Sequence, residues 1–159
     1  MPTWPPNPLI AMLHAEAVQV DVDAASRKRV FEQVGALIER LHGLKARDVS
    51  DALFERERLG STALGFGVAI PHARLAALGA PLAAVLRLRQ ALPFDSPDDE
   101  PVSLLIVMLV PSAATEQHLQ ALAWIAEMLS DRAQRERLQA APGAPALYEA
   151  LAGWQPAGA

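Results

Sequence analysis

Residues 60–72 read GSTALGFGVAIPH, a glycine-rich turn followed by a short apolar segment that stops at a Pro-His step. Three glycines let the backbone adopt positive φ and approach other groups closely. Residues 68–70 predict a buried strand, and Pro71, which has no N–H to donate, is expected to end its ladder. His72 would then leave from the end of a strand, where α/β proteins tend to place their chemistry. This makes His72 a candidate for proton or phosphoryl chemistry.

Strands and helices are expected to alternate on both sides of this stretch. Further strands are predicted at about 17–22, 81–88 and 102–110. Helices are predicted at about 24–41, 48–59, 115–130, 131–140 and 145–154, after a helical turn at 9–13. The continuous apolar run at 102–110 suits the centre of a sheet. The class is therefore α/β, a sheet covered by helices.

Local signals predict where two of these helices begin and end. Asp23 is expected to cap the first long helix, and His42-Gly43 to end it. In the second helix Leu59 is expected to face inward, and Gly60 to follow its last turn.

The length of 159 residues suits one domain. We expect that domain over residues 9–155, preceded by a flexible arm, residues 1–8, that contains four prolines. The arm has no basic segment or long apolar run typical of a signal peptide. The longest apolar stretch, 104–110, is far shorter than the roughly 20 residues of a membrane span. We therefore expect no membrane insertion.

The net charge and the absence of cysteine argue against several classes of partner and chemistry. A net charge of −4 argues against nucleic acid or an acidic membrane surface as a partner. The absence of cysteine removes disulfides and thiolate chemistry, and it fits a cytoplasmic location. The four histidines show no zinc-ligand spacing, and the glycines match neither a Walker A loop nor a dinucleotide fingerprint.

Considered alone, each candidate side chain also has a structural interpretation. His72 could be a hydrogen-bonded structural residue, and His118 an exposed histidine near the start of a helix. Arg56 lies in a charged helix end, where such residues are usually solvated. Its guanidinium nevertheless offers the planar fork of donors that suits phosphate oxygens. Arg58 competes with it for that role, and the Thr62 hydroxyl could contact phosphate or cap the turn.

The order and spacing of three motifs carry a family resemblance. Glu55-Arg56-Glu57, Gly60-Ser61-Thr62 and the GVAIPH segment at 67–72 together resemble the active-site signature of enzyme IIA of the fructose/mannitol class. These proteins belong to the bacterial phosphoenolpyruvate-dependent phosphotransferase system. The resemblance covers about residues 10–151, and among subtypes the chain looks most like the nitrogen-regulatory enzyme IIA.

This resemblance implies a fold and a set of roles. The fold is a mixed sheet sandwiched between helices. His72 accepts a phosphoryl group from an HPr-type carrier protein, with Arg56 beside it and His118 opposite. Thr62 is a weaker candidate for a phosphate contact, and no cofactor or metal is required. Such a protein accepts and donates a phosphoryl group on histidine rather than acting as a stand-alone enzyme, and its phosphorylation state regulates partner proteins.

Two alternatives stay open. The chain could be a sugar-transport enzyme IIA that passes the phosphoryl group to a IIB domain. It could also be a pure binding regulator with no onward transfer.

Two residues depart from the family pattern: Phe66 stands where an amide residue is common, and Ala73 where glycine is frequent. Phe66 is expected to place a large ring next to the site and to alter partner docking.

Overall fold

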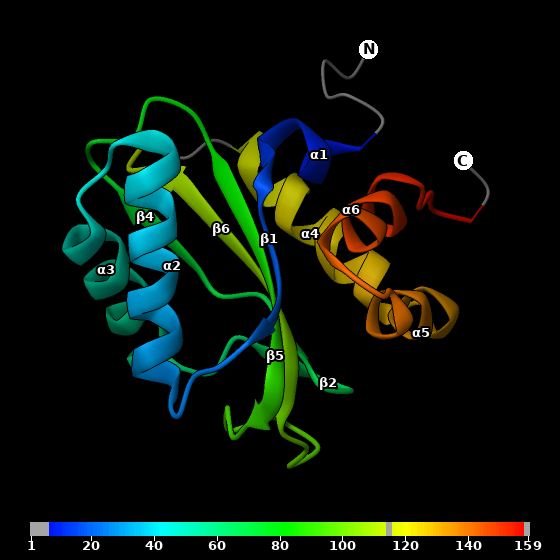
Figure 1. Cartoon of the computed structure of the whole chain (residues 1–159). Helices are drawn as coiled ribbons and strands as arrows, with labels where there is room; N and C mark the ends of the chain where they lie inside the picture. Colours follow the sequence, from blue (N-terminus) through cyan, green and yellow to red (C-terminus); the bar gives the residue numbers. More distant parts are fainter. Residues whose placement is uncertain (1–6, 114–115, 158–159) are drawn as a thin grey trace.

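A computed structural model describes residues 7–113 and 116–157. These residues form a six-stranded mixed sheet with helices on both faces (Figure 1). The helices are α1 (Pro8–Met12), α2 (Arg27–His42), α3 (Ala46–Leu59), α4 (Glu116–Ser130), α5 (Arg132–Ala140) and α6 (Ala144–Ala152). The strands are β1 (Leu13–Val22), β2 (Ala63–Gly65), β3 (Val68–Ala69), β4 (His72–Leu75), β5 (Leu82–Leu92) and β6 (Val102–Pro111). The predicted α/β class and mixed sheet are confirmed.

The sheet has the strand order β1-β5-β6-β3-β2, and β4 also pairs with β6. β1 runs parallel to β5, and both β3 and β4 run parallel to β6. The β5–β6 and β2–β3 pairs are antiparallel. β1 is therefore an edge strand, and β6 lies inside the sheet.

The apolar run of β6 is buried because both faces of the sheet are covered. Helices α2 and α3 pack on one face, and α4, α5 and α6 lie on the other (Figure 1). Residues 104–107 of β6 are 0% exposed, which a central strand between two helical layers requires. The prediction of a central strand at 102–110 is confirmed.

The segment around Pro71 forms two short strands, whereas the sequence predicted one strand that ends at Pro71. β3 and β4 are two segments that follow one another along the same edge of β6, with Val68 opposite Leu104 and His72 opposite Met108. Pro71 interrupts the ladder without ending it, because its carbonyl still accepts a hydrogen bond from the Met108 N–H (2.9 Å). The prediction that His72 follows the last residue of a strand was wrong: His72 is the first residue of β4.

Several predicted boundaries also shift. Ser26, not Asp23, caps α2, because its side chain accepts a hydrogen bond from the Arg29 N–H. Gly43 ends α2 with φ of 75°, as expected of a glycine after a helix. Strand β5 continues to Leu92, beyond the predicted end, since pairing with β1 and β6 outweighs the weak strand propensity of its alanines and leucines.

Helix α3 buries Val49, Leu53 and Glu57, which recur every four residues on one face. Leu59 falls outside this face and is 85% exposed, so the prediction that it faces inward was wrong.

Residues 1–6 of the predicted arm and Thr115, the predicted start of a helix, lie outside the described residues. Asn7 and Pro8, which were assigned to the arm, belong to the folded part. The Asn7 side chain caps α1 and donates a hydrogen bond to the Leu151 carbonyl (2.9 Å). Within residues 7–113 and 116–157, no helix has the length and apolar character needed to cross a membrane.

Candidate functional site

A pocket of about 390 Å³ opens between α3, α4 and the neighbouring strands β4 and β6. It is lined by Ala52, Glu55, Arg56, Leu59, His72, Ala73, Arg74, Met108, Val110, His118, Leu119 and Leu122. Three residues singled out from the sequence, His72, Arg56 and His118, thus come from three different elements and line one pocket. Strand pairing explains the lining, because His72 and Met108 are register partners in the β4–β6 ladder.

The His72 ring is half-buried and has a defined orientation. Its Nδ1 lies 2.8 Å from the carbonyl oxygen of Ile70. A carbonyl oxygen can only accept, so Nδ1 carries the proton and Nε2 carries the lone pair. No side chain or backbone group of the described residues makes a hydrogen bond to Nε2. A short backbone contact thereby fixes the tautomer that leaves Nε2 nucleophilic.

The surroundings of His72 favour the neutral ring. Burial lowers the pKa of His72 below its ordinary value of 6.5, and the positive charge of Arg56 lowers it further. The hydrogen bond to Ile70 and the carboxylate of Glu57 act in the opposite direction, but the pKa remains lowered. At neutral pH the ring is therefore uncharged.

We expect an NMR titration of His72 to give a midpoint below that of an unstructured histidine. Because the folded-state pKa is lowered, His72 contributes stability that is fully present above the unfolded-state pKa of 6.5. That contribution is lost as the pH falls through the folded-state pKa. A midpoint at or above 6.5 would contradict this prediction.

Arg56 lies at the end of α3 and lines the same pocket. Its Nη1 donates a hydrogen bond to the Gly60 carbonyl (2.8 Å). The remaining N–H groups of this guanidinium are available to a ligand. The competing Arg58 does not line the pocket and instead pairs with Glu55 at 2.8 Å. Of these two arginines, only Arg56 lines the pocket that contains His72.

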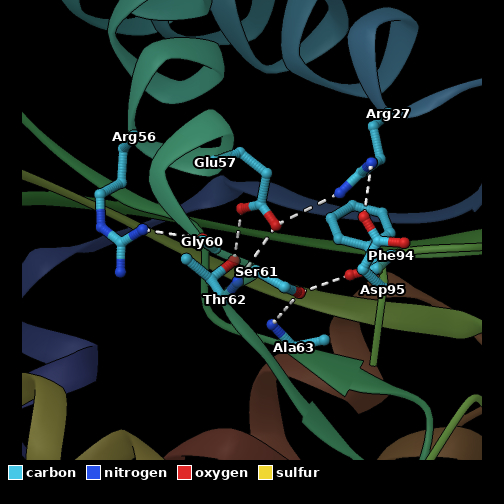
Figure 2. Close-up of polar contacts among 9 residues, drawn as sticks. All are labelled: Arg27, Arg56, Glu57, Gly60, Ser61, Thr62, Ala63, Phe94 and Asp95. Atoms are coloured by element: carbon cyan, nitrogen blue, oxygen red, sulfur yellow. Dashed lines mark hydrogen bonds and ion pairs between the residues drawn. The ribbon is translucent and has the colours of Figure 1, made fainter. Parts of the chain in front are cut away.

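The buried carboxylate of Glu57 holds the turn that follows Arg56 (Figure 2). It accepts hydrogen bonds from the Thr62 N–H (3.1 Å) and the Thr62 hydroxyl (2.7 Å). Arg27 of α2 lies 3.7 Å from the same carboxylate. Arg56 and Glu57 leave the helix end on different sides, so one residue serves the pocket and the other anchors the loop (Figure 2).

The same network extends to the connection between β5 and β6. The Ser61 hydroxyl donates to the Phe94 carbonyl and accepts from the Ala63 N–H (Figure 2). Arg27 also pairs with Asp95 at 3.2 Å, and its guanidinium lies 5.5 Å from the centre of the Phe94 ring. The turn that Arg56 contacts through Gly60 is thus held at several points.

We expect Thr62→Val to lower the free energy of unfolding by about 1–3 kcal/mol, because the buried Glu57 carboxylate loses a hydroxyl donor. Urea unfolding measures this difference. As a control, Ser50→Ala removes a hydroxyl that bonds only to the Arg47 carbonyl within the same helix, and it should cost much less. Equal stabilities for Thr62→Val and the unsubstituted protein would show that Glu57 does not depend on this hydroxyl.

His118 and Thr62 differ in their access to the pocket. His118 is half-buried in the first turn of α4 and lines the pocket. Thr62 is 5% exposed, is not among the lining residues, and uses its hydroxyl to bind Glu57. In this arrangement the Thr62 hydroxyl would have to leave Glu57 before it could contact a ligand.

Phe66 does not lie next to the pocket, so that prediction was wrong. The residue has φ of 58° in the turn between β2 and β3, and its N–H donates to Asp98 (2.8 Å). Its ring stacks against Arg135 of α5, with the guanidinium 4.2 Å from the ring centre. The turn carries Phe66 to the β3 end of the ladder, whereas His72 begins the β4 segment four β6 positions further on.

Several pocket residues were not anticipated from the sequence. Leu59 and Leu119 are 85% and 56% exposed at the rim, and Arg74 lies two residues after His72. Strand alternation could have indicated Arg74, because residues two apart share a face of a strand. In the parts of the chain that the structure describes, no group of three or more His, Cys, Asp or Glu residues is arranged to hold a metal ion.

Comparison with known proteins assigns the class to which this fold and pocket belong. Residues 11–153 match the model of the family described as phosphoenolpyruvate-dependent sugar phosphotransferase system, EIIA 2, and the chain belongs to that family. Proteins of this family work in phosphoryl-transfer chains with other proteins of the same system.

Several individual proteins are similar to this chain over most of its length. The chain is 48% identical over 131 residues to a nitrogen regulatory protein of Pseudomonas aeruginosa, covering 82% of this chain and 85% of that protein. The crystal structure of nitrogen regulatory protein IIA-Ntr from Neisseria meningitidis superimposes with a TM-score of 0.84 at 41% identity, covering 89% and 97% of the two chains. A fructose-specific EIIA component of Haloferax volcanii is 34% identical over 138 residues, covering 86% and 90%.

Proposed function

We propose that this protein accepts a phosphoryl group on His72 from an HPr-type carrier and regulates partner proteins by its phosphorylation state. The observation that carries the proposal is the hydrogen bond between His72 Nδ1 and the Ile70 carbonyl (2.8 Å). It leaves the Nε2 lone pair as the nucleophile of a half-buried, neutral ring in a pocket that also holds Arg56 and His118. The similarity to nitrogen regulatory proteins supports the regulatory part.

The transfer step follows from this geometry. The Nε2 lone pair of His72 attacks phosphorus, and an N–P bond forms. The P–N bond of the carrier's phosphohistidine breaks, and its electron pair returns to the carrier's ring. The proton on Nδ1 stays in its hydrogen bond to Ile70, so the phosphorylated ring of His72 is an imidazolium and no proton moves within this chain. The charge balances when the carrier's phosphohistidine ring is itself protonated before transfer and leaves as neutral imidazole.

The other pocket residues stabilise charge in this scheme. The oxygens of the transferring phosphoryl group carry negative charge. Arg56 stabilises this charge by donating hydrogen bonds from its remaining N–H groups. His118 donates a hydrogen bond to the same group or helps to position it. Thr62 holds the turn through Glu57, and a direct contact between its hydroxyl and the phosphoryl group stays a weaker prediction.

The test is to incubate the protein with phosphoenolpyruvate, enzyme I and HPr, and to map the phosphate by peptide mass spectrometry. The proposal expects one labelled residue, His72, with a linkage that is labile in acid and stable in base. Labelling of another residue, or none at all, would contradict it.

We expect His118→Ala to accept phosphate about tenfold more slowly, because a hydrogen bond to a charged group is lost. His118→Gln should have a milder effect, since an amide N–H can replace the donor. Rapid-quench measurement of labelling distinguishes the two variants. Phosphate found on His118 itself would contradict its assignment as an assisting residue.

A second function has a specific observation in its favour: the similar Haloferax protein is a fructose-specific EIIA component. Under this alternative, His72 passes its phosphoryl group to a IIB domain. Adding a panel of IIB proteins to the purified phosphoprotein separates the possibilities. Rapid discharge to one IIB favours sugar transport, whereas a phosphoprotein that discharges to none favours a pure binding regulator.

A further inference from the structure

The pocket around His72 contains a second guanidinium. Arg74 is exposed on β4, lines the pocket, and has no ion pair or side-chain hydrogen bond with any residue that the structure describes. By contrast, arginines of the neighbouring helix α3 form ion pairs: Arg58 pairs with Glu55, and Arg47 pairs with Asp51. An unpaired cation in this position is available to a ligand.

Strand geometry places Arg74 on the same face as His72. The two residues are separated by about 6.6 Å of strand rise, which a long arginine side chain covers. Their register partners on β6, Met108 and Val110, also line the pocket. Alternate residues of both β4 and β6 therefore line the same pocket. This agreement between two strands supports the placement of His72 and Arg74 on one face of the sheet.

The charges of the pocket favour a doubly negative group. Two guanidiniums, those of Arg56 and Arg74, line it against one carboxylate, that of Glu55. The Glu55 carboxylate is already paired with Arg58 at 2.8 Å. A phosphoryl group on His72 Nε2 would bring the negative charge that this pocket lacks.

We propose that Arg74 binds the phosphoryl group on His72 and prolongs the lifetime of the phosphorylated protein. The inference rests on the proposed function, since it requires phosphorylation of His72. Arg56 faces the group from α3 and Arg74 from β4, so the two arginines contact its oxygens from different sides. Arg74 is therefore a residue of the phosphoryl site that acts after transfer as well as during it.

Arg74 also borders a second hollow, which is lined in part by Lys45, Asp48 and Asp51. Neither carboxylate is paired with Arg74, but both border the hollow that Arg74 shares. If Arg74 served only to pair with them, its replacement would alter stability and leave the phosphoryl group unaffected. The test must therefore observe the phosphoryl group directly.

The experiment labels the full chain with potassium phosphoramidate, a chemical donor that needs no carrier protein. The N–P bond to His72 Nε2 forms, the P–N bond of the donor breaks, and ammonia leaves. We compare the unsubstituted protein with Arg74→Ala, Arg74→Lys and, as a matched control, Arg29→Ala, which removes an exposed arginine that borders neither the pocket nor the second hollow. Two quantities are measured: the lifetime of the label, and the ³¹P NMR titration of the phosphoryl group.

Arg74→Ala should shorten the lifetime about tenfold and raise the titration midpoint of the phosphoryl oxygens, because a nearby cation favours the dianion. Arg74→Lys keeps the charge, so its label lifetime and titration midpoint should fall between those of Arg74→Ala and the unsubstituted protein. Arg29→Ala should match the unsubstituted protein. Equal lifetimes and midpoints for the unsubstituted protein and both Arg74 variants would overturn the inference. Labelling by phosphoramidate without labelling by HPr would contradict the carrier assignment alone. Labelling by neither donor would contradict both proposals.

Discussion

His72→Ala is expected to abolish phosphorylation by phosphoenolpyruvate, enzyme I and HPr. The substitution removes Nε2, the pocket nitrogen whose lone pair is fixed by the hydrogen bond between Nδ1 and the Ile70 carbonyl. The remaining polar side chains of the pocket are two arginines, one carboxylate and His118. The arginines are not nucleophilic while they carry a charge. We expect labelling to fall to background, a larger loss than any other substitution in the pocket would cause.

Two controls make this result specific. His14→Ala removes an exposed histidine outside the pocket and should label normally. Circular dichroism of His72→Ala should show an unchanged fold, because the ring makes one hydrogen bond and is only half-buried. Undiminished labelling of a folded His72→Ala protein would assign the phosphoryl group to another residue.

Arg56→Lys is expected to slow phosphoryl transfer by about 10²–10³, the usual effect of losing one preorganised donor to a developing charge. Lysine keeps the positive charge but loses the planar fork that can bond to Gly60 and to phosphate oxygens together. The loop itself should stay in place, because Glu57 and Ser61 hold it independently of Arg56.

Single-turnover kinetics with phosphorylated HPr measure this effect. Arg58→Lys is the matched control, since Arg58 precedes the same turn, does not itself line the pocket, and as a lysine keeps a positive charge beside Glu55. Equal rates for Arg56→Lys and the unsubstituted protein would remove Arg56 from the transfer step. A slow Arg58→Lys protein would instead return the role to the competing arginine.

The sequence by itself was sufficient for the features that depend on local chemistry. The glycines at 65 and 67 do adopt positive φ, at 92° and 78°, and Gly43 ends its helix as predicted. The apolar run at 102–110 is the buried central strand. These features follow from backbone restrictions and apolar periodicity, which act over a few residues and can be recognised without knowledge of the fold.

The motif order also pointed to His72, Arg56 and His118, but through a family resemblance rather than through spacing. Nothing local to residue 118 distinguishes a pocket histidine from an exposed one. These three residues line one pocket because β4, α3 and α4 meet beside β6, and Arg56 and His118 are 62 residues apart in the chain (118 − 56).

Only the tertiary structure decided how the pocket is completed. Pairing with β6 turned the residues after Pro71 into a second strand segment, and this alternation brought Arg74 to the face of His72. Hydrogen bonds from Thr62 drew Glu57 into the interior at the position where a helix would ordinarily bury an apolar residue, and Leu59 was left exposed at the rim. The β2–β3 turn carried Phe66 away toward α5. Each outcome depends on strand register or on packing between distant elements, and neither of these is determined by any short stretch of sequence.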